Sequence, residues 1–202
     1  MGTPTFAVPV LEKLIENTKV VLVVSQPDKE VGRKKVKQMT PVKEIAVKHN
    51  IPVFQPEKIR KDYEPIMASK PDLIITCAYG QIIPEVLLNL PKLGAFNVHA
   101  SLLPKYRGGA PIHWALINGE KQTGVTIMYM DKGMDTGDMI SKVIYDIKPE
   151  DNVGTLHEVL SSLGANLLIE TLPSIINHTN EREKQDEEKA SYAYNIKRKG
   201  DL

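Results

Sequence analysis

Cysteine is nearly absent from this 202-residue chain, whose one thiol is Cys77 in the apolar run "LIITCAYG". A disulfide within the chain is therefore excluded, and a reducing compartment is the simplest setting. Free cysteines are among the most buried residue types, so we interpret Cys77 as a core residue rather than a nucleophile.

Excess charge and long apolar runs are lacking too. The formal net charge is +1, so no global field draws the protein to nucleic acid, and any such contact must come from a local patch. No apolar run approaches the roughly 18–20 residues of a membrane helix. The start, "MGTPTFAV", lacks the features of a signal peptide and of a myristoylation site. We therefore expect a soluble cytoplasmic protein with no membrane partner.

Several motifs of catalysis and phosphate binding are missing. Without "GxSxG" or a plausible nucleophilic cysteine, direct attack by the substrate's own nucleophile is more natural than a covalent enzyme intermediate. Neither "GxGxxG" nor "GxxxxGK[ST]" occurs. The segment "HASLLPKYRGGAPIH" holds two histidines but no obvious third ligand, so we predict no metal site.

What is present is an alternation of helical and strand patterns in the first half. Continuous Val/Ile/Leu runs between helices predict an α/β fold with a mostly parallel sheet, covered by helices on both faces. Its ligand site is expected beyond the carboxyl ends of the strands. The expected helices cover 6–17, 40–50, the charged segment around 57–70 and 84–89, and the expected strands lie in 19–26, 51–54, 72–78 and 95–100.

The second half has a different pattern. Segments 124–131 and 139–147 read as strands joined by a glycine-rich turn, which favours a hairpin. A helix is expected from about 153 to 177. After residue 178 the composition becomes highly charged, which predicts a solvated tail or linker. We therefore expect a catalytic domain over 1–178 and a charged linker over 179–202.

Two polar residues interrupt the apolar strand "AFNVHA". Asn97 and His99 are two apart, so they share one face, at the end of the strand that should adjoin a ligand. Asp135 lies downstream in "MDKGMDTGDM", beside Asp131 and Asp138. A core histidine and turn-forming acids explain these residues equally well. If the three converge, they suit acyl transfer: the amide stabilises an oxyanion, the imidazole handles a proton, and the carboxylate orients the imidazole.

The segment 28–37, "DKEVGRKKVK", carries five basic residues against two acids. It can be a solvated exposed loop, which is the simpler interpretation. Alternatively it is a phosphate-contacting arm, in which Arg33, Lys34 and Lys35 supply the charge.

Five segments together resemble a known family: "MGTPTFAVPVLEKL", "QPDKEVGRKK", "FNVHASLLPKYRGGAPIHWALINGE", "TGVTIMYMDKGMDTGDMI" and "DNVGTLHEVLSSLGANLLIETL". The chain is similar to the 10-formyltetrahydrofolate-dependent formyltransferases along essentially its whole length. Its opening block and basic loop are similar to the branch that acts on methionyl-tRNA.

The resemblance implies a Rossmann-like formyltransferase fold, with 10-formyltetrahydrofolate as formyl donor and methionyl initiator tRNA as acceptor. It implies that Asn97, His99 and Asp135 form the catalytic triad. It also implies that Ser101, Leu102, Leu103 and Pro104 line the folate site, and that the loop of Arg33, Lys34 and Lys35 meets the tRNA acceptor end. We expect a monomer.

The chain also departs from this family. The amino-terminal strand and the carboxyl-terminal barrel domain of the family are not in this sequence. Two alternatives follow: an inactive remnant that binds folate or tRNA, or a formyltransferase for another amine, such as an amino sugar.

Overall fold

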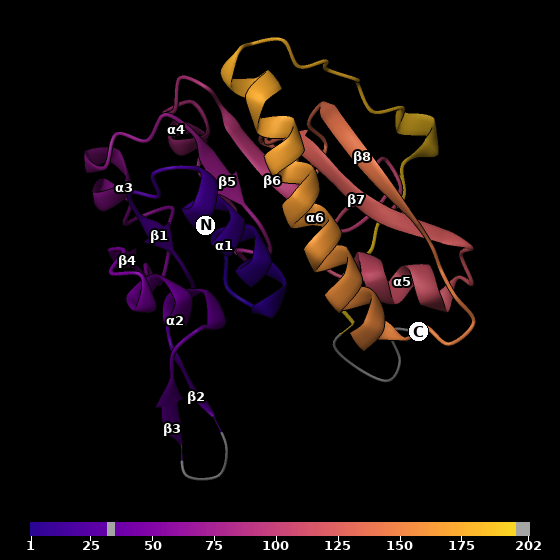
Figure 1. The fold of residues 1–202 in the computed structure, drawn as a ribbon, viewed down its shortest axis with the longest axis horizontal. Coiled ribbons are helices and arrows are strands. Elements are labelled where there is room, and N and C mark those ends of the chain that lie inside the picture. Colours follow the sequence, from indigo (N-terminus) through magenta and orange to yellow (C-terminus); the bar gives the residue numbers. More distant parts are fainter. Residues whose placement is uncertain (32–34, 197–202) are drawn as a thin grey trace. The chain divides into compact units, whose positions relative to one another are not determined.

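The computed structural model describes residues 1–31 and 35–196. The chain forms two compact units, Met1–Phe96 and Asn97–Leu202, which are described separately (Figure 1). Strand β6 (Ala95–His99) begins in the first unit and ends in the second. This division reflects local packing, and the predicted boundary at residue 178 stays a prediction.

The helices of the first unit begin where the sequence has helix-starting residues. Helix α2 starts at Pro41, and the Thr40 hydroxyl caps it by accepting from the Lys43 amide at 3.2 Å. In α1, Pro9 lies in the first turn, where its missing N–H is harmless. Both helices confirm the prediction, whereas 57–70 is helical only at its end. The bounds are η1 Thr5–Ala7, α1 Val8–Asn17, α2 Pro41–Lys48, α3 Glu64–Ala68 and α4 Glu85–Leu88.

The strands of the first unit lie where predicted, but they are shorter. Strand β1 (Val23–Val24) pairs in parallel with β4 (Val53–Phe54), and β5 (Ile74–Thr76) pairs with β6. The first residues of the chain lie between β1 and β5. The Gly2 amide donates to the Val24 carbonyl, and the Cys77 amide donates to the Met1 carbonyl, both at 2.9 Å.

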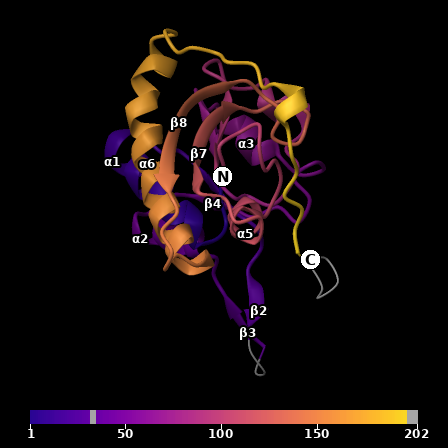
Figure 2. The ribbon, with the colours of Figure 1, turned by 90° about the vertical axis from the view of Figure 1, so that its right-hand side faces the viewer.

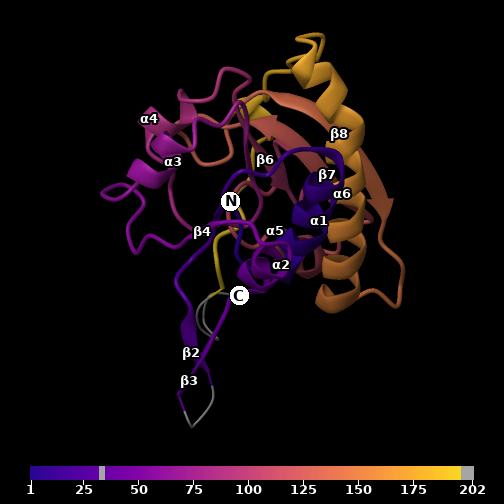
Figure 3. The same cartoon turned by 60° about the vertical axis from the view of Figure 1, so that its left-hand side comes forward.

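Residues 29–31 and 36–38 pair as the two strands of a hairpin, in a segment where the sequence predicted only a polar loop. Strands β2 (Lys29–Val31) and β3 (Val36–Gln38) pair antiparallel and project beyond α2 (Figures 1 and 3). Asp28 fixes its base: one carboxylate oxygen lies 2.6 Å from the Lys43 Nζ, and the other accepts from the Gln55 amide at 2.7 Å. These bonds, the Gln55 one first, lower the pKa of Asp28.

The second unit is built on a longer hairpin that confirms the prediction. Strands β7 (Gln122–Tyr129) and β8 (Met139–Asp146) pair antiparallel, with a register shift at Ile127 and Met128. The strand order is β6-β7-β8. Helix α5 (Pro111–Ile117), which was not predicted from the sequence, packs near α6.

Helix α6 (Val153–Ile176) covers one face of the β7–β8 hairpin (Figures 1 and 2). It begins with a capping box formed by Asn152 and Thr155. By length and composition alone it could cross a membrane, which corrects the expectation that no segment approaches that length. A buried core helix passes the same test, and residues such as Leu160 and Leu168, both 0% exposed, face the strands.

The segment after α6 differs from the solvated tail that its composition predicted. Most of its side chains are exposed, yet its backbone pairs with the rest of the unit. Glu183 forms a bridge with Met139, Tyr192 forms one with Arg107, and Ala193 is 0% exposed. These backbone contacts order the segment while Glu183 and Tyr192 stay exposed and Ala193 is buried, and the tail and linker roles stay predictions.

Candidate active site

The end of strand β6 presents two polar side chains on one face. Asn97 and His99 lie there, while Val98 points to the other side and packs on α6. At Gly164 of α6, an added Cβ would lie 3.0 Å from a Val98 methyl group, so glycine allows this close approach. His99 is only 5% exposed, and Asn97 is half-buried. The alternation of the strand therefore places both residues as predicted.

Asp135, in the loop between β7 and β8, meets both of them. The Asn97 Nδ2 donates to Asp135 Oδ1 at 3.4 Å, and the His99 Nδ1 lies 3.7 Å from Asp135 Oδ2. The Gly108 amide also donates to Oδ2, at 2.8 Å. Asp135 has φ 54°, a left-handed conformation that non-glycine residues rarely adopt. The three residues converge as expected, and their catalytic roles stay predictions.

The partners of His99 restrict what its ring can do. Its Nε2 lies 2.9 Å from the Tyr106 carbonyl oxygen. A carbonyl oxygen only accepts, so Nε2 must carry the hydrogen and donate it. Nδ1, which faces Asp135, is therefore the ring nitrogen that remains for proton transfer or for stabilising an oxyanion.

A second polar cluster, not identified from the sequence, surrounds Tyr106. The Tyr106 hydroxyl donates to Glu120 at 2.6 Å and accepts from the Asn118 amide at 2.9 Å. Burial and the bond to Glu120 raise the pKa of Tyr106, and that bond lowers the pKa of Glu120. Because Tyr106 also supplies the carbonyl for His99, this cluster holds the loop after β6. Only the block "KYRGG…NGE" could have indicated it.

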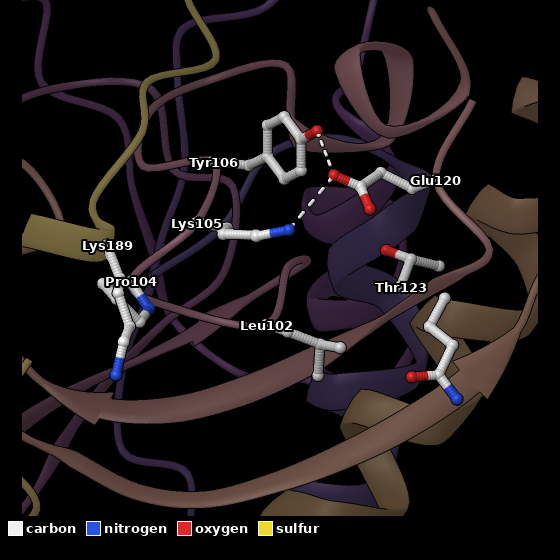
Figure 4. A pocket seen from close by; sticks show the side chains of 8 residues that line it. Leu102, Pro104, Lys105, Tyr106, Glu120, Thr123 and Lys189 are labelled. Atoms are coloured by element: carbon white, nitrogen blue, oxygen red, sulfur yellow. Dashed lines mark hydrogen bonds and ion pairs between the residues drawn. The ribbon is translucent and has the colours of Figure 1, made fainter. Parts of the chain in front are cut away.

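A cavity of about 440 Å³ opens beside this cluster (Figure 4). The Tyr106 and Lys105 side chains converge on Glu120 at its wall. The lining residues are Leu102, Pro104, Lys105, Tyr106, Glu120, Gln122, Thr123 and Lys189.

The four residues assigned to the folate site divide into two pairs. Leu102 and Pro104 line the cavity. Ser101 and Leu103 are 1% and 2% exposed. The Ser101 hydroxyl donates to the Lys105 carbonyl at 2.7 Å, and the Leu103 amide donates to the Thr126 hydroxyl at 3.2 Å. Only Leu102 and Pro104 therefore offer surface to a ligand.

The remaining candidate residues lie in the first unit. Arg33 and Lys34 fall outside the described residues, and Lys35 is exposed next to β3. Cys77 is buried, as expected, and burial raises the pKa of its thiol to about 12. Within residues 1–31 and 35–196, no three His, Cys, Asp or Glu side chains group as metal ligands would.

Comparison with known proteins adds independent information. The family described as "Formyl transferase" matches residues 1–172. The chain is 60% identical to the methionyl-tRNA formyltransferase of Bacillus subtilis, over 100% of this chain and 65% of the relative. It is 58% identical to that of Staphylococcus epidermidis, over 98% of this chain and 64% of the relative. The chain thus spans about 65% of the length of these relatives.

Among solved structures, an N-formyltransferase from Helicobacter canadensis has a TM-score of 0.73 and 26% identity, with 96% of this chain and 68% of that one covered. It was solved in complex with folinic acid and dTDP-3-aminofucose. A TM-score of this size over nearly the whole chain confirms the predicted α/β, Rossmann-like fold.

Proposed function

Because this chain belongs to the formyl transferase family, we propose that it transfers a formyl group from 10-formyltetrahydrofolate to the α-amine of methionyl initiator tRNA, for translation initiation. The observation that carries this proposal is the 60% identity with the Bacillus subtilis methionyl-tRNA formyltransferase along the whole chain. The convergence of Asn97, His99 and Asp135 supports it with a site suited to acyl transfer.

The amine of the acceptor is the nucleophile. An α-amine has an ordinary pKa of about 7.7–8.0, so a useful fraction is neutral near neutral pH. Its lone pair forms the new C–N bond to the formyl carbon, and the carbonyl electrons move to the oxygen. When this tetrahedral intermediate collapses, the bond to N10 of the folate breaks and N10 takes a proton. The amine loses one proton in the same sequence.

The site residues act on the charge that develops in these steps. The Asn97 amide donates to the oxyanion, and His99 stabilises it through Nδ1–H, since its Nε2–H is bonded to Tyr106. Asp135 keeps Nδ1 oriented and can accept the amine proton directly or through a water molecule. This division of roles requires His99 to be protonated when the oxyanion forms.

The two substrates are assigned to different segments. The folate donor contacts Leu102 and Pro104, the accessible members of the predicted segment 101–104. The tRNA contacts the basic segment that follows β2 in the sequence, in which Arg33, Lys34 and Lys35 supply positive charge. We further propose that the protein is a cytoplasmic monomer without a membrane partner and without a catalytic metal.

The test is an acceptor comparison with the full-length protein. It is incubated with 10-formyltetrahydrofolate and either methionyl initiator tRNA or a dTDP-linked amino sugar, and the formylated product is quantified. We expect formylation of methionyl-tRNA. Formylation of the sugar alone would reassign the acceptor. If neither acceptor is formylated, the alternative of an inactive remnant that binds folate or tRNA would be favoured.

Asn97→Ala tests the chemistry of the site. Loss of one oxyanion donor typically costs about 10²–10³ in rate, so turnover should fall by that factor while folate binding is retained. Asn17→Ala, at the exposed end of α1, is the control and should leave turnover unchanged. Normal turnover in Asn97→Ala would remove Asn97 from the proposed mechanism.

A further inference from the structure

Arg107 follows Tyr106 in the loop after β6, and its side chain is completely buried, at 0% exposed. Its guanidinium binds Glu187 through two parallel bonds, Nη1 to Oε2 at 3.0 Å and Nη2 to Oε1 at 2.8 Å. Its Nε donates to the Gln185 Oε1 at 2.9 Å. Bidentate pairs of this kind fix both partners in position. These side-chain bonds all reach residues 185–193, called the strap below.

Gln185 connects the strap to the loop that carries Asp135. Its Nε2 donates to the Asp135 carbonyl at 2.7 Å and to the Gly137 carbonyl at 2.8 Å, while its Oε1 accepts from Arg107. Only an amide side chain can donate two bonds and accept a third in this arrangement. Gln185 therefore ties three segments together: the loop after β6, the β7–β8 loop and the strap.

The backbone of the strap supports the same loop. The Arg107 amide donates to the Ser191 carbonyl at 2.8 Å, and the Ala193 amide donates to the Arg107 carbonyl at 2.7 Å. The next residue, Gly108, donates its amide to the Asp135 carboxylate. Gly108 has φ 111°, and an added Cβ would lie 2.9 Å from the Ala193 carbonyl oxygen. The strap therefore fixes the amide that binds the carboxylate.

We propose that the strap is the positioning element of Asp135, with Gln185 as its principal positioning residue. This inference rests on the proposed function, because it assigns Gln185 to the same formyl-transfer site. Asp135 adopts a left-handed backbone conformation, which costs energy and persists only where surrounding contacts stabilise it. Gln185 holds the Asp135 carbonyl, and the strap-supported Gly108 amide holds the carboxylate. The strap touches no reacting atom and acts through Asp135.

Gln185→Leu tests the proposal, since leucine has similar volume and makes none of the three hydrogen bonds. Small displacements of a catalytic group can cost about a hundredfold in rate, so kcat should fall by about 10–100-fold with KM for methionyl-tRNA unchanged. Gln185→Glu keeps the acceptor for Arg107 but turns a carboxylate toward two carbonyl oxygens. Its kcat should therefore also lie below that of the wild type. Glu188→Leu, at an exposed neighbour, is the matched control for placing a leucine in the strap and should leave kcat unchanged.

A double-mutant cycle separates positioning from general stability. If Gln185 acts through Asp135, adding Gln185→Leu to Asp135→Asn should lower kcat little further. Full additivity of the two losses in kcat would overturn the proposal. So would an unchanged kcat in Gln185→Leu accompanied only by a lower unfolding temperature.

A readout independent of formylation keeps this test separate from that of the proposed function. The His99 ring signals are recorded by NMR in the wild type, in Gln185→Leu and in Asp135→Asn. In Gln185→Leu their chemical shifts should move toward those of Asp135→Asn, because the carboxylate is no longer held at Nδ1. Unchanged chemical shifts would overturn the proposal even if methionyl-tRNA is not the acceptor, whereas failure of the wild type to formylate it affects the proposed function alone.

Discussion

The β2–β3 hairpin of the first unit and the β7–β8 hairpin of the second are both antiparallel, and both carry predicted functional residues in their loops. They differ in how they are held. Residues of β3 are exposed, with Val36 at 57%, and the base of that hairpin is fixed by the polar contacts of Asp28. The β7 residues from Thr123 to Met128 are buried, and α6 covers the β7–β8 hairpin.

The packed and the exposed hairpin suit different functions. A residue that stabilises a developing charge must be held to within a fraction of an ångström, so the loop of Asp135 needs a packed hairpin and the strap. A basic residue that contacts phosphates acts mainly through charge and reach, which an exposed hairpin supplies. Packing under the catalytic loop and exposure of β3 beside the basic segment therefore fit the roles proposed for them.

Truncating the core under the β7–β8 hairpin should have the largest effect on stability. Leu168→Ala removes a fully buried side chain of α6, and such changes cost about 2–5 kcal/mol of unfolding free energy. Val36→Ala, the corresponding truncation on the β2–β3 hairpin, should cost less than about 0.5 kcal/mol. Denaturant unfolding of both variants measures this. Equal losses would show that the exposed hairpin is packed after all.

Asp135→Asn tests the loop itself rather than its support. The asparagine keeps an oxygen for the Gly108 amide but removes the negative charge beside His99. We expect turnover to fall by about 10²–10³, comparable with loss of an oxyanion donor. Asp138→Asn removes the same charge from the same loop, where Asp138 pairs with exposed Arg182, and should stay near wild type. If the two variants lose activity equally, the loop acts through its overall charge.

Much of the fold could be predicted from local patterns. Three signals predicted their elements correctly because each lies within the element itself. They are the Thr40–Pro41 start of α2, the apolar periodicity of α6 and the alternation of apolar and polar residues in β6. Strand lengths were overestimated, since pairing depends on neighbours that the sequence does not reveal. The β2–β3 hairpin was missed because its strands are polar and short, and helix α5 because its start at Pro111 follows a glycine-rich loop.

The site was only partly predictable. Asn97 and His99 were found from strand alternation, but the approach of Asp135 came from the family resemblance, because residues 38 positions apart give no local signal. The roles of Gln185 and Glu187 were hidden by composition, which indicates solvation for such a charged segment. Their partner, Arg107, gave no sign of burial, since a lone arginine in a loop is ordinarily exposed.

The smallest expected effect concerns the exposed hairpin. Arg33→Ala should weaken methionyl-tRNA binding and reduce the slope of log affinity against log salt by about 0.7–0.9, the contribution of one phosphate contact. Lys48→Ala, an exposed cation of α2, is the control and should leave the slope unchanged. Binding titrations at several salt concentrations measure both, and turnover at saturating tRNA should be normal in each. A lower saturating turnover in Arg33→Ala would mean that Arg33 also positions the reacting amine, so the contrast between a basic segment that acts through charge and a rigid catalytic loop would no longer hold.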